Sequence, residues 1–67
     1  MIENAEKATE IAVSFIKQYY PWVTRPMKAN REDSTWTVDI DVGLLKIEIV
    51  TVKIDAVEEN VISYEKK

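Results

Sequence analysis

The side chains in this sequence that could do chemistry are mainly carboxylates, because the chain contains no histidine and no cysteine. Without these two residue types, the usual zinc sites, a thiol nucleophile and a conventional serine triad are excluded. The single glycine also rules out a glycine-rich phosphate loop. Two carboxylates can in principle perform acid–base catalysis, but a domain of 67 residues offers little room for a deep pocket. We therefore expect a protein that is not an enzyme and that binds no cofactor.

Three acidic residues, Asp39, Asp41 and Glu48, are expected on one face of a sheet, opposite an apolar stripe. Calcium and magnesium prefer several carboxylate oxygens, so this face is a candidate site for a metal ion or another small ligand. The alternative is an ordinary solvated face whose charge is offset by the nearby Lys46. No segment has the spacing of an EF-hand loop. The pattern favours the ordinary face and leaves the cation site as a second hypothesis.

A basic stretch interleaved with aromatic residues covers residues 17–31. It holds four basic residues and no acidic one, whereas the whole chain has nine basic and twelve acidic residues. Basic groups beside stacking rings are typical of single-stranded nucleic-acid binding, but the acidic total makes nucleic acid the less favoured ligand. An anionic protein partner fits the stretch better. The candidate partner-binding residues are Trp22, Arg25, Lys28 and Arg31.

The first element that must position these side chains is a helix, expected over residues 4–20. Apolar residues recur every three or four positions from Ala5 to Tyr19, which is the period of a helix with one buried face. Asn4 is a suitable N-cap, and acidic residues near the start complement the helix dipole. Pro21 ends the helix, because the residue before a proline avoids the helical conformation.

Four short strands are expected after the helix, at residues 27–30, 35–42, 45–56 and 61–66. Two prolines near the first of them restrict it to a sheet edge. From residue 35 onward, apolar and polar residues alternate, as in a strand with one buried face. The predicted fold class is therefore α+β, in which an N-terminal helix packs on a three- to four-stranded antiparallel meander. We expect residues 1–67 to form a single domain.

The first hairpin of this sheet is expected to turn at Gly43 and Leu44, since a two-residue turn of this type requires glycine first. The turn pairs apolar residues with one another: Val42 with Leu45, Ile40 with Ile47, and Val38 with Ile49. The apolar residues after Ile49 have the opposite parity. A β-bulge near Ile49 and Val50 would accommodate that change.

The second hairpin is expected to close across residues 58–60, with Asn60 as the left-handed residue of a three-residue loop. This register pairs apolar residues on one face of the sheet and oppositely charged residues on the other. The expected pairs are Ala56 with Ile62, Ile54 with Tyr64, and Lys53 with Glu65.

Two segments resemble a known family. Residues 31–42, with their polar turn, Trp36 and alternating strand, are similar to part of the gas vesicle protein O family, and residues 50–66, with Asp55 and Tyr64, resemble its later hairpin. The order of a helix and then a meander also resembles PepSY-type domains, which are generally interaction or inhibitory modules. The resemblance covers about half of the chain. It implies the same kind of fold and supplies no catalytic residues.

The size of the chain favours association with a partner. A domain this small has a thin core, and no disulfide can stabilise it, so a partner protein or a second copy would cover an exposed sheet edge. No stretch is apolar enough to span a membrane, and the start of the chain lacks the pattern of a signal peptide. We therefore expect a non-catalytic cytoplasmic protein that binds another protein or forms a homodimer and does not associate with a membrane.

Overall fold

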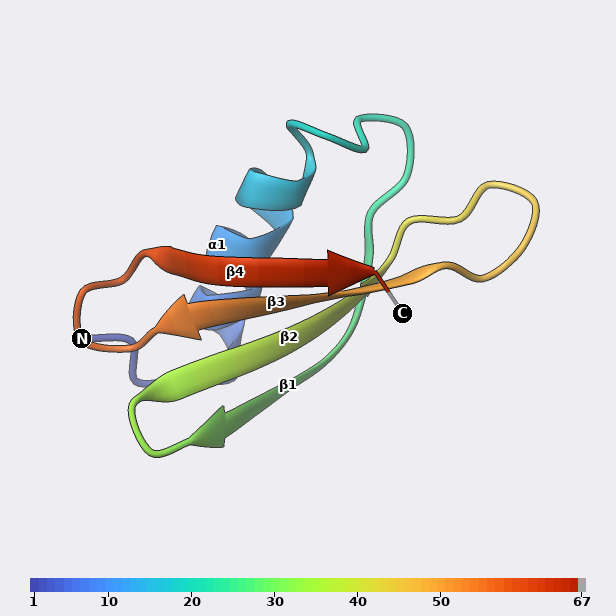
Figure 1. Ribbon diagram of the computed structural model, residues 1–67. Coiled ribbons are helices and arrows are strands. Elements are labelled where there is room, and N and C mark those ends of the chain that lie inside the picture. Colours follow the sequence, from blue (N-terminus) through green and yellow to red (C-terminus); the bar gives the residue numbers. More distant parts are fainter. Residues whose placement is uncertain (67) are drawn as a thin grey trace.

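The computed structural model describes residues 1–66 and shows one helix followed by a four-stranded sheet. The elements are α1 (Ala5–Ile16), β1 (Arg25–Glu32), β2 (Thr35–Asp41), β3 (Ile49–Asp55) and β4 (Val61–Lys66). The strands are antiparallel to their neighbours and lie in the order β1-β2-β3-β4, and α1 packs on one face of the sheet (Figure 1). The predicted α+β class and the meander topology are confirmed.

Helix α1 starts where the sequence predicts but ends one turn earlier. The side chain of Asn4 accepts a hydrogen bond of 2.8 Å from the amide three residues further on, as an N-cap does. At the other end, the amides of Tyr19 and Tyr20 both donate to the carbonyl of Ile16, each at 2.9 Å. Because two donors share one carbonyl, the chain tightens there into a turn, and the regular helix is already over before Pro21.

The hydrophobic core lies between α1 and the face of the sheet that α1 covers. The segment before α1 belongs to this core, because Ile2 is buried and donates its amide to the carbonyl of Ala56 at 2.7 Å. The indole Nε1 of Trp36 donates to the carbonyl of Ile2 at 3.2 Å, so this large buried ring has a partner for its polar atom. The buried apolar residues are Ile2, Ala8, Ala12, Ile16, Trp36, Val38, Ile40, Val42, Val50, Val52, Ile54 and Ala56.

The first strand lies at the sheet edge, as predicted, but it is longer than the expected residues 27–30. It includes Pro26, and its register with β2 shifts between Pro26 and Lys28. An edge strand tolerates a proline because its outer side needs no hydrogen bonds. The connection to β2 is a tight turn in which Asp33 has a φ of 53°, a left-handed conformation that aspartate adopts more readily than most residues.

The predicted pairing between the second and third strands is wrong. In the structure the buried pairs of β2 and β3 are Trp36 with Ile54, Val38 with Val52, and Ile40 with Val50. Residues 42–48 form a loop instead of a two-residue turn, and no register shift interrupts β2 and β3, so the bulge predicted at Ile49 and Val50 is absent from this pairing. Both registers pair apolar residues with each other. The observed one does so without a bulge, because residues 50, 52 and 54 already alternate in phase.

The second hairpin is also shifted from its predicted register, in this case by two residues. Val52 faces Tyr64 and Lys53 faces Ser63, and a register shift lies between Lys53 and Ile54. The left-handed residue of the turn is Glu59, with a φ of 60°, and not Asn60.

A shift of two residues leaves Tyr64 on the core face, as predicted. Beyond the register shift, however, Val61 faces Ile54 and packs against the core. Ile62, which was expected on the core face, is exposed and lines a pocket with Thr37 and Lys53.

Asp55 explains the change of register in the second hairpin. Its Oδ1 accepts hydrogen bonds from the amides of Val57 at 2.8 Å and Glu58 at 3.0 Å, and its carbonyl accepts from the amide of Glu59 at 2.8 Å. A carboxylate that captures the following amides forms a compact turn of its own. The turn therefore begins at Asp55, earlier than the alternation of apolar residues indicates.

Candidate functional site

Exposed apolar side chains gather at the end of the sheet where β2 leads into the 42–48 loop. Leu44, Leu45 and Ile47 are 63%, 101% and 72% exposed. Trp22, from the segment between α1 and β1, is 59% exposed and lines the same pocket as the two leucines. Figure 1 shows the loop, in yellow, projecting beyond the strands. We refer to Trp22, Leu44, Leu45 and Ile47 as the apolar tip.

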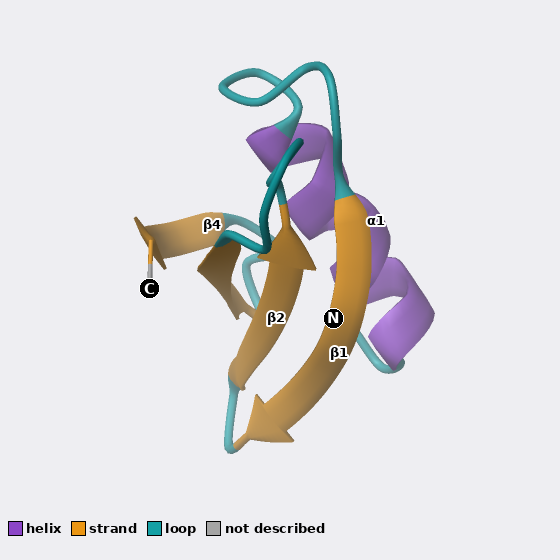
Figure 2. Cartoon of the chain, turned by 90° about the vertical axis from the view of Figure 1, so that its right-hand side faces the viewer, coloured by secondary structure: helices purple, strands orange, loops and turns teal. Residues whose placement is uncertain are grey.

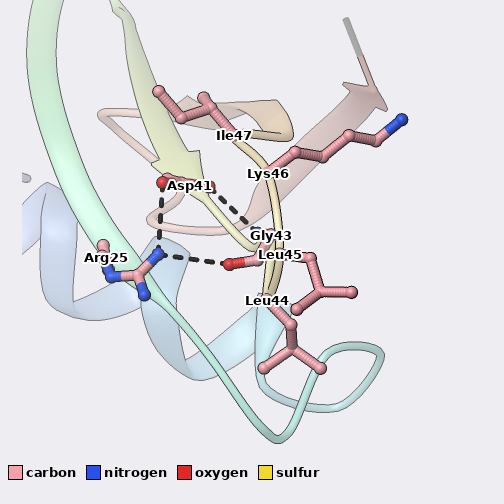
Figure 3. A pocket seen from close by; sticks show the side chains of 7 residues that line it. All are labelled: Arg25, Asp41, Gly43, Leu44, Leu45, Lys46 and Ile47. Atoms are coloured by element: carbon pink, nitrogen blue, oxygen red, sulfur yellow. Dashed lines mark hydrogen bonds and ion pairs between the residues drawn. The ribbon is translucent and has the colours of Figure 1, made fainter.

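The base of the loop is held by the carboxylate of Asp41, which is only 8% exposed. Its Oδ1 accepts hydrogen bonds from the amides of Gly43 at 2.9 Å and Glu48 at 3.2 Å. Its Oδ2 lies 3.3 Å from Nη1 of Arg25, and the same nitrogen donates to the carbonyl of Gly43 at 3.2 Å (Figure 3). One side chain therefore joins both ends of the loop to the edge strand β1.

Position 43 requires glycine because a side chain would clash with the backbone, and not because of its φ angle. A Cβ at this position would lie 1.6 Å from the carbonyl oxygen of Lys46, and the φ of Gly43 is not positive. The loop folds back so closely that only a residue without a side chain fits. The sequence therefore correctly predicted that the chain turns at Gly43. It predicted a two-residue turn, however, whereas the structure has a longer loop in which glycine avoids a steric clash.

These contacts lower the pKa of Asp41. The largest cause is the hydrogen bond from the amide of Gly43, followed by the amide of Glu48, and the charge of Arg25 acts in the same direction. Burial opposes them by penalising the ionised form. The net effect is a carboxylate that stays charged, and therefore able to accept all of its hydrogen bonds, at lower pH than usual.

We expect the loop to open only in acid. Because the folded pKa of Asp41 lies below its ordinary value of 3.8, its stabilising effect is complete above that value and is lost as the pH falls through the folded pKa. The amide resonances of Gly43 and Glu48 should therefore titrate together, with a midpoint below 3.8, when followed by NMR. Asp41→Asn should abolish this shared titration and Asp33→Asn should preserve it. A midpoint above 3.8 would contradict the assigned contacts.

Two pockets flank the loop, and both are lined by Leu44, Leu45 and Lys46. One, of about 210 Å³, lies between the loop and Arg25, and the other, of about 310 Å³, lies between the loop and Trp22. Figure 3 shows Leu44 and Leu45 pointing away from the hydrogen-bonded base of the loop. The arrangement is a protruding apolar surface with Arg25 at its base and Lys46 beside both pockets.

The structure does not bring the three predicted cation ligands into one group. The oxygens of Asp41 hold the loop, Asp39 Oδ1 accepts a hydrogen bond of 2.8 Å from Thr51, and Glu48 lies 3.4 Å from the ammonium of Lys66. Among residues 1–66, no cluster of three or more such groups could hold a metal ion. The face is also not an ordinary solvated one, because Asp39 and Asp41 are buried.

The structure brings together two of the four predicted partner-binding residues. Trp22 belongs to the apolar tip and Arg25 to the base of the loop. Lys28 lies further along β1, opposite Asp39, and Arg31 is near the other end of that strand, where its Nε donates to the carbonyl of Asp33 at 3.0 Å. The basic stretch is therefore spread along the edge strand and does not form one patch.

Sequence reasoning missed the three aliphatic residues of the apolar tip because it assigned Leu45 and Ile47 to the core and Leu44 to a tight turn. One signal could have identified the loop. Residues 50, 52 and 54 complete a buried face without a bulge, and this leaves residues 44–47 without partners in the sheet.

Beyond this site, no helix within residues 1–66 is both long and apolar enough to cross a membrane. A scan against protein-family models, a search of curated proteins and a search of solved structures each found no match. The resemblance to the gas vesicle protein O family and to PepSY-type domains therefore stays a prediction.

Proposed function

We propose that this protein is a small non-catalytic module that binds another protein through the apolar tip. The observation that carries the proposal is the contrast between the buried base of the loop and its exposed end. Asp41 and Arg25 fix the base, while Leu45 is fully exposed at the end. Contiguous exposed apolar residues rimmed by polar groups are typical of protein interaction sites.

The energetic reason for binding is the apolar area that the loop leaves in water. Complete burial of one leucine or isoleucine side chain contributes about 1.5–3 kcal/mol, and the apolar tip offers three aliphatic side chains and a tryptophan. Because the loop is already held at its base, little conformational entropy remains to be lost when a partner covers it. A preformed apolar loop is thus suited to insertion into a partner's groove.

The charges around the apolar tip indicate the kind of partner. Lys46 lines both pockets of the loop, and the guanidinium of Arg25 lines one of them. An apolar groove with acidic residues along its rim would match this surface, and charge complementarity of this kind mainly supports specificity and the rate of encounter. A cytoplasmic location is part of the proposal, since a chain without cysteine fits a reducing compartment.

Site-specific photo-crosslinking at the apolar tip tests this proposal. A photoreactive phenylalanine derivative at position 45 should give one discrete protein adduct in cells that express the chain, and the same group at the exposed Glu10 should not. Leu44→Asp in the position-45 background should reduce the adduct by on the order of tenfold, because it places a charge in the interface. The same substitution should change the stability of the isolated protein by less than about 0.5 kcal/mol, since Leu44 is exposed.

The result would count against the proposal if adducts formed equally at positions 45 and 10, or at neither. Thermal unfolding of each variant, followed by circular dichroism, separates a loss of binding from a loss of folding.

A further inference from the structure

The two ends of the molecule carry different surfaces. The molecule is elongated, with dimensions of 35 × 19 × 18 Å. Figure 1 shows the β1–β2 turn, in green, at one end of the sheet and the 42–48 loop, in yellow, at the other. The apolar tip of a chain therefore cannot reach the β1–β2 turn of the same chain.

A pocket of about 490 Å³ lies beside the β1–β2 turn. It is lined by residues 32–35, by Thr37 and Lys53, which face each other across β2 and β3, and by Ile62 of β4. Because Thr37 follows the buried Trp36 in its strand, the pocket opens on the face of the sheet that α1 does not cover. Figure 2 shows α1 on the other side of the sheet. We refer to this pocket as the turn pocket.

The turn pocket combines an exposed apolar side chain with an excess of acidic groups. Ile62 is 56% exposed, so an aliphatic side chain placed in the pocket would meet another one. Glu32 and Asp33 contribute two carboxylates and Lys53 contributes one ammonium, so the pocket is negative overall. Within residues 1–66, neither of these carboxylates forms an ion pair.

The apolar tip has the complementary properties. It projects from the sheet, and Leu44 and Leu45 point outward from the base of the loop (Figure 3). Lys46 also extends outward, and it forms no ion pair with any residue from 1 to 66. The charge of Arg25, in contrast, is already paired with Asp41. Lys46 is therefore the cation that the loop offers to a partner.

From these observations we infer that the apolar tip of one copy of this chain binds in the turn pocket of a second copy. The inference rests on the proposed function, because it identifies the partner of the apolar tip as the same protein. Leu44 and Leu45 contact Ile62 of the second copy, and Lys46 lies beside its acidic rim. The turn pocket thus has the apolar surface and the acidic rim that the apolar tip matches.

The contact joins two different surfaces, so it is heterologous. A two-fold dimer buries the same surface on both copies, whereas a contact between tip and pocket leaves one free tip and one free pocket on each pair of molecules. Further copies can therefore add head to tail, and the product at high concentration is a linear oligomer. A single loop in a shallow pocket makes a small interface, and small interfaces bind weakly. We expect a dissociation constant on the order of 100 μM for each contact.

Sedimentation and NMR of the purified whole chain, from about 10 μM to about 1 mM, test the inference. The average mass should rise with concentration and should not level off at that of a dimer. Concentration-dependent amide shifts should appear in two separate regions, residues 44–47 and residues 32–37 with Ile62, because each contact involves both ends of the molecule. Shifts confined to residues 44–47 would indicate a two-fold contact between tips and would overturn the inference. A chain that stays monomeric at about 1 mM would overturn it as well.

Exchange of charges between the two surfaces is the sharper test. Lys46→Glu and Glu32→Lys each place like charges in the contact, so each should raise the dissociation constant about fivefold. The double variant with both substitutions restores opposite charges and should return the constant to within about twofold of its original value. Glu10→Lys on α1 is the matched control and should leave it unchanged. All three side chains are exposed, so the fold tolerates the changes. A double variant that associates no better than the single variants would contradict the pairing of these two surfaces.

Photo-crosslinking of the purified chain separates a failure of this inference from a failure of the proposed function. With the photoreactive group at position 45, the purified chain should form covalent dimers whose second attachment lies within residues 32–37 or at Ile62. If no such dimer forms while the same group captures a different protein in cells, the inference is wrong and the proposed function stands. If neither experiment gives an adduct, both are wrong.

Discussion

Replacing Ile40 with alanine should remove most of the stability of this protein, whereas replacing Ile47 with alanine should change it little. Ile40 is completely buried in the central strand β2 and faces Val50. Truncation of a buried isoleucine costs about 2–5 kcal/mol, because the transfer free energy is lost and a cavity remains. A domain of this size has a total stability of roughly 3–10 kcal/mol, so the variant should be largely unfolded or close to it.

Ile47 is the matched control for this experiment. It is 72% exposed in the 42–48 loop, and exposed substitutions usually change stability by less than about 0.5 kcal/mol. Urea denaturation followed by circular dichroism measures both variants under the same conditions. The comparison also distinguishes the two strand registers, because the pairing expected from the sequence places Ile40 and Ile47 together in the core. Similar losses of stability for the two variants would favour that pairing over the observed one.

Replacing Gly43 with alanine should disrupt the 42–48 loop while leaving the rest of the sheet in place. The added Cβ would lie 1.6 Å from a backbone oxygen, and backbone atoms cannot move aside as the end of a flexible side chain can. The loop must therefore adopt another path, with loss of the hydrogen bonds that Asp41 makes to the amides of Gly43 and Glu48. We expect a destabilisation of about 1–3 kcal/mol, the range typical of overpacking, and toward its upper end because the clash is with backbone.

Leu44→Ala, at the adjacent exposed residue, is the control for Gly43→Ala and should be nearly neutral. Amide shifts in the glycine variant should change strongly over residues 41–48 and weakly in β4. The photo-crosslink from position 45 should also be lost, since the apolar tip no longer has a fixed base. A variant with wild-type stability and unchanged amide shifts at positions 43 and 48 would show that the loop does not approach itself as closely as the structure indicates.

The first prediction and its control give opposite outcomes for the same kind of side chain. Ile40 and Ile47 have the same chemistry, and each is part of an alternating apolar pattern in the sequence. One is in the core and the other in water because β2 and β3 pair through residues 50, 52 and 54. If the apolar tip does bind a partner, the residues that sequence patterning assigns to the core are those that function in recognition.

The helix start, the buried face of β2 and the order of the elements could be predicted from the sequence, because each depends on residues close together in the chain. Asn4 caps the helix through an amide only three residues away, and the alternation from Thr35 onward determines which side chains share a face of the sheet. The order of one helix and a meander follows from the succession of these local patterns. The lack of histidine and cysteine likewise restricts the available chemistry in any fold.

The strand registers and the loop site were decided only by the tertiary structure. Several registers pair apolar residues with apolar residues, so local pattern cannot choose between them. The choice depends on which apolar segment fills the space under α1, and residues 50–54 do so without a bulge while residues 44–47 are left outside. The ion pair between Asp41 and Arg25 depends on the same strand register, because β1 and the loop are brought together only when the sheet has formed. Of the three carboxylates that suggested an ion site in the sequence, Asp41 supports the exposed apolar loop in the fold, whereas Asp39 and Glu48 bind Thr51 and Lys66.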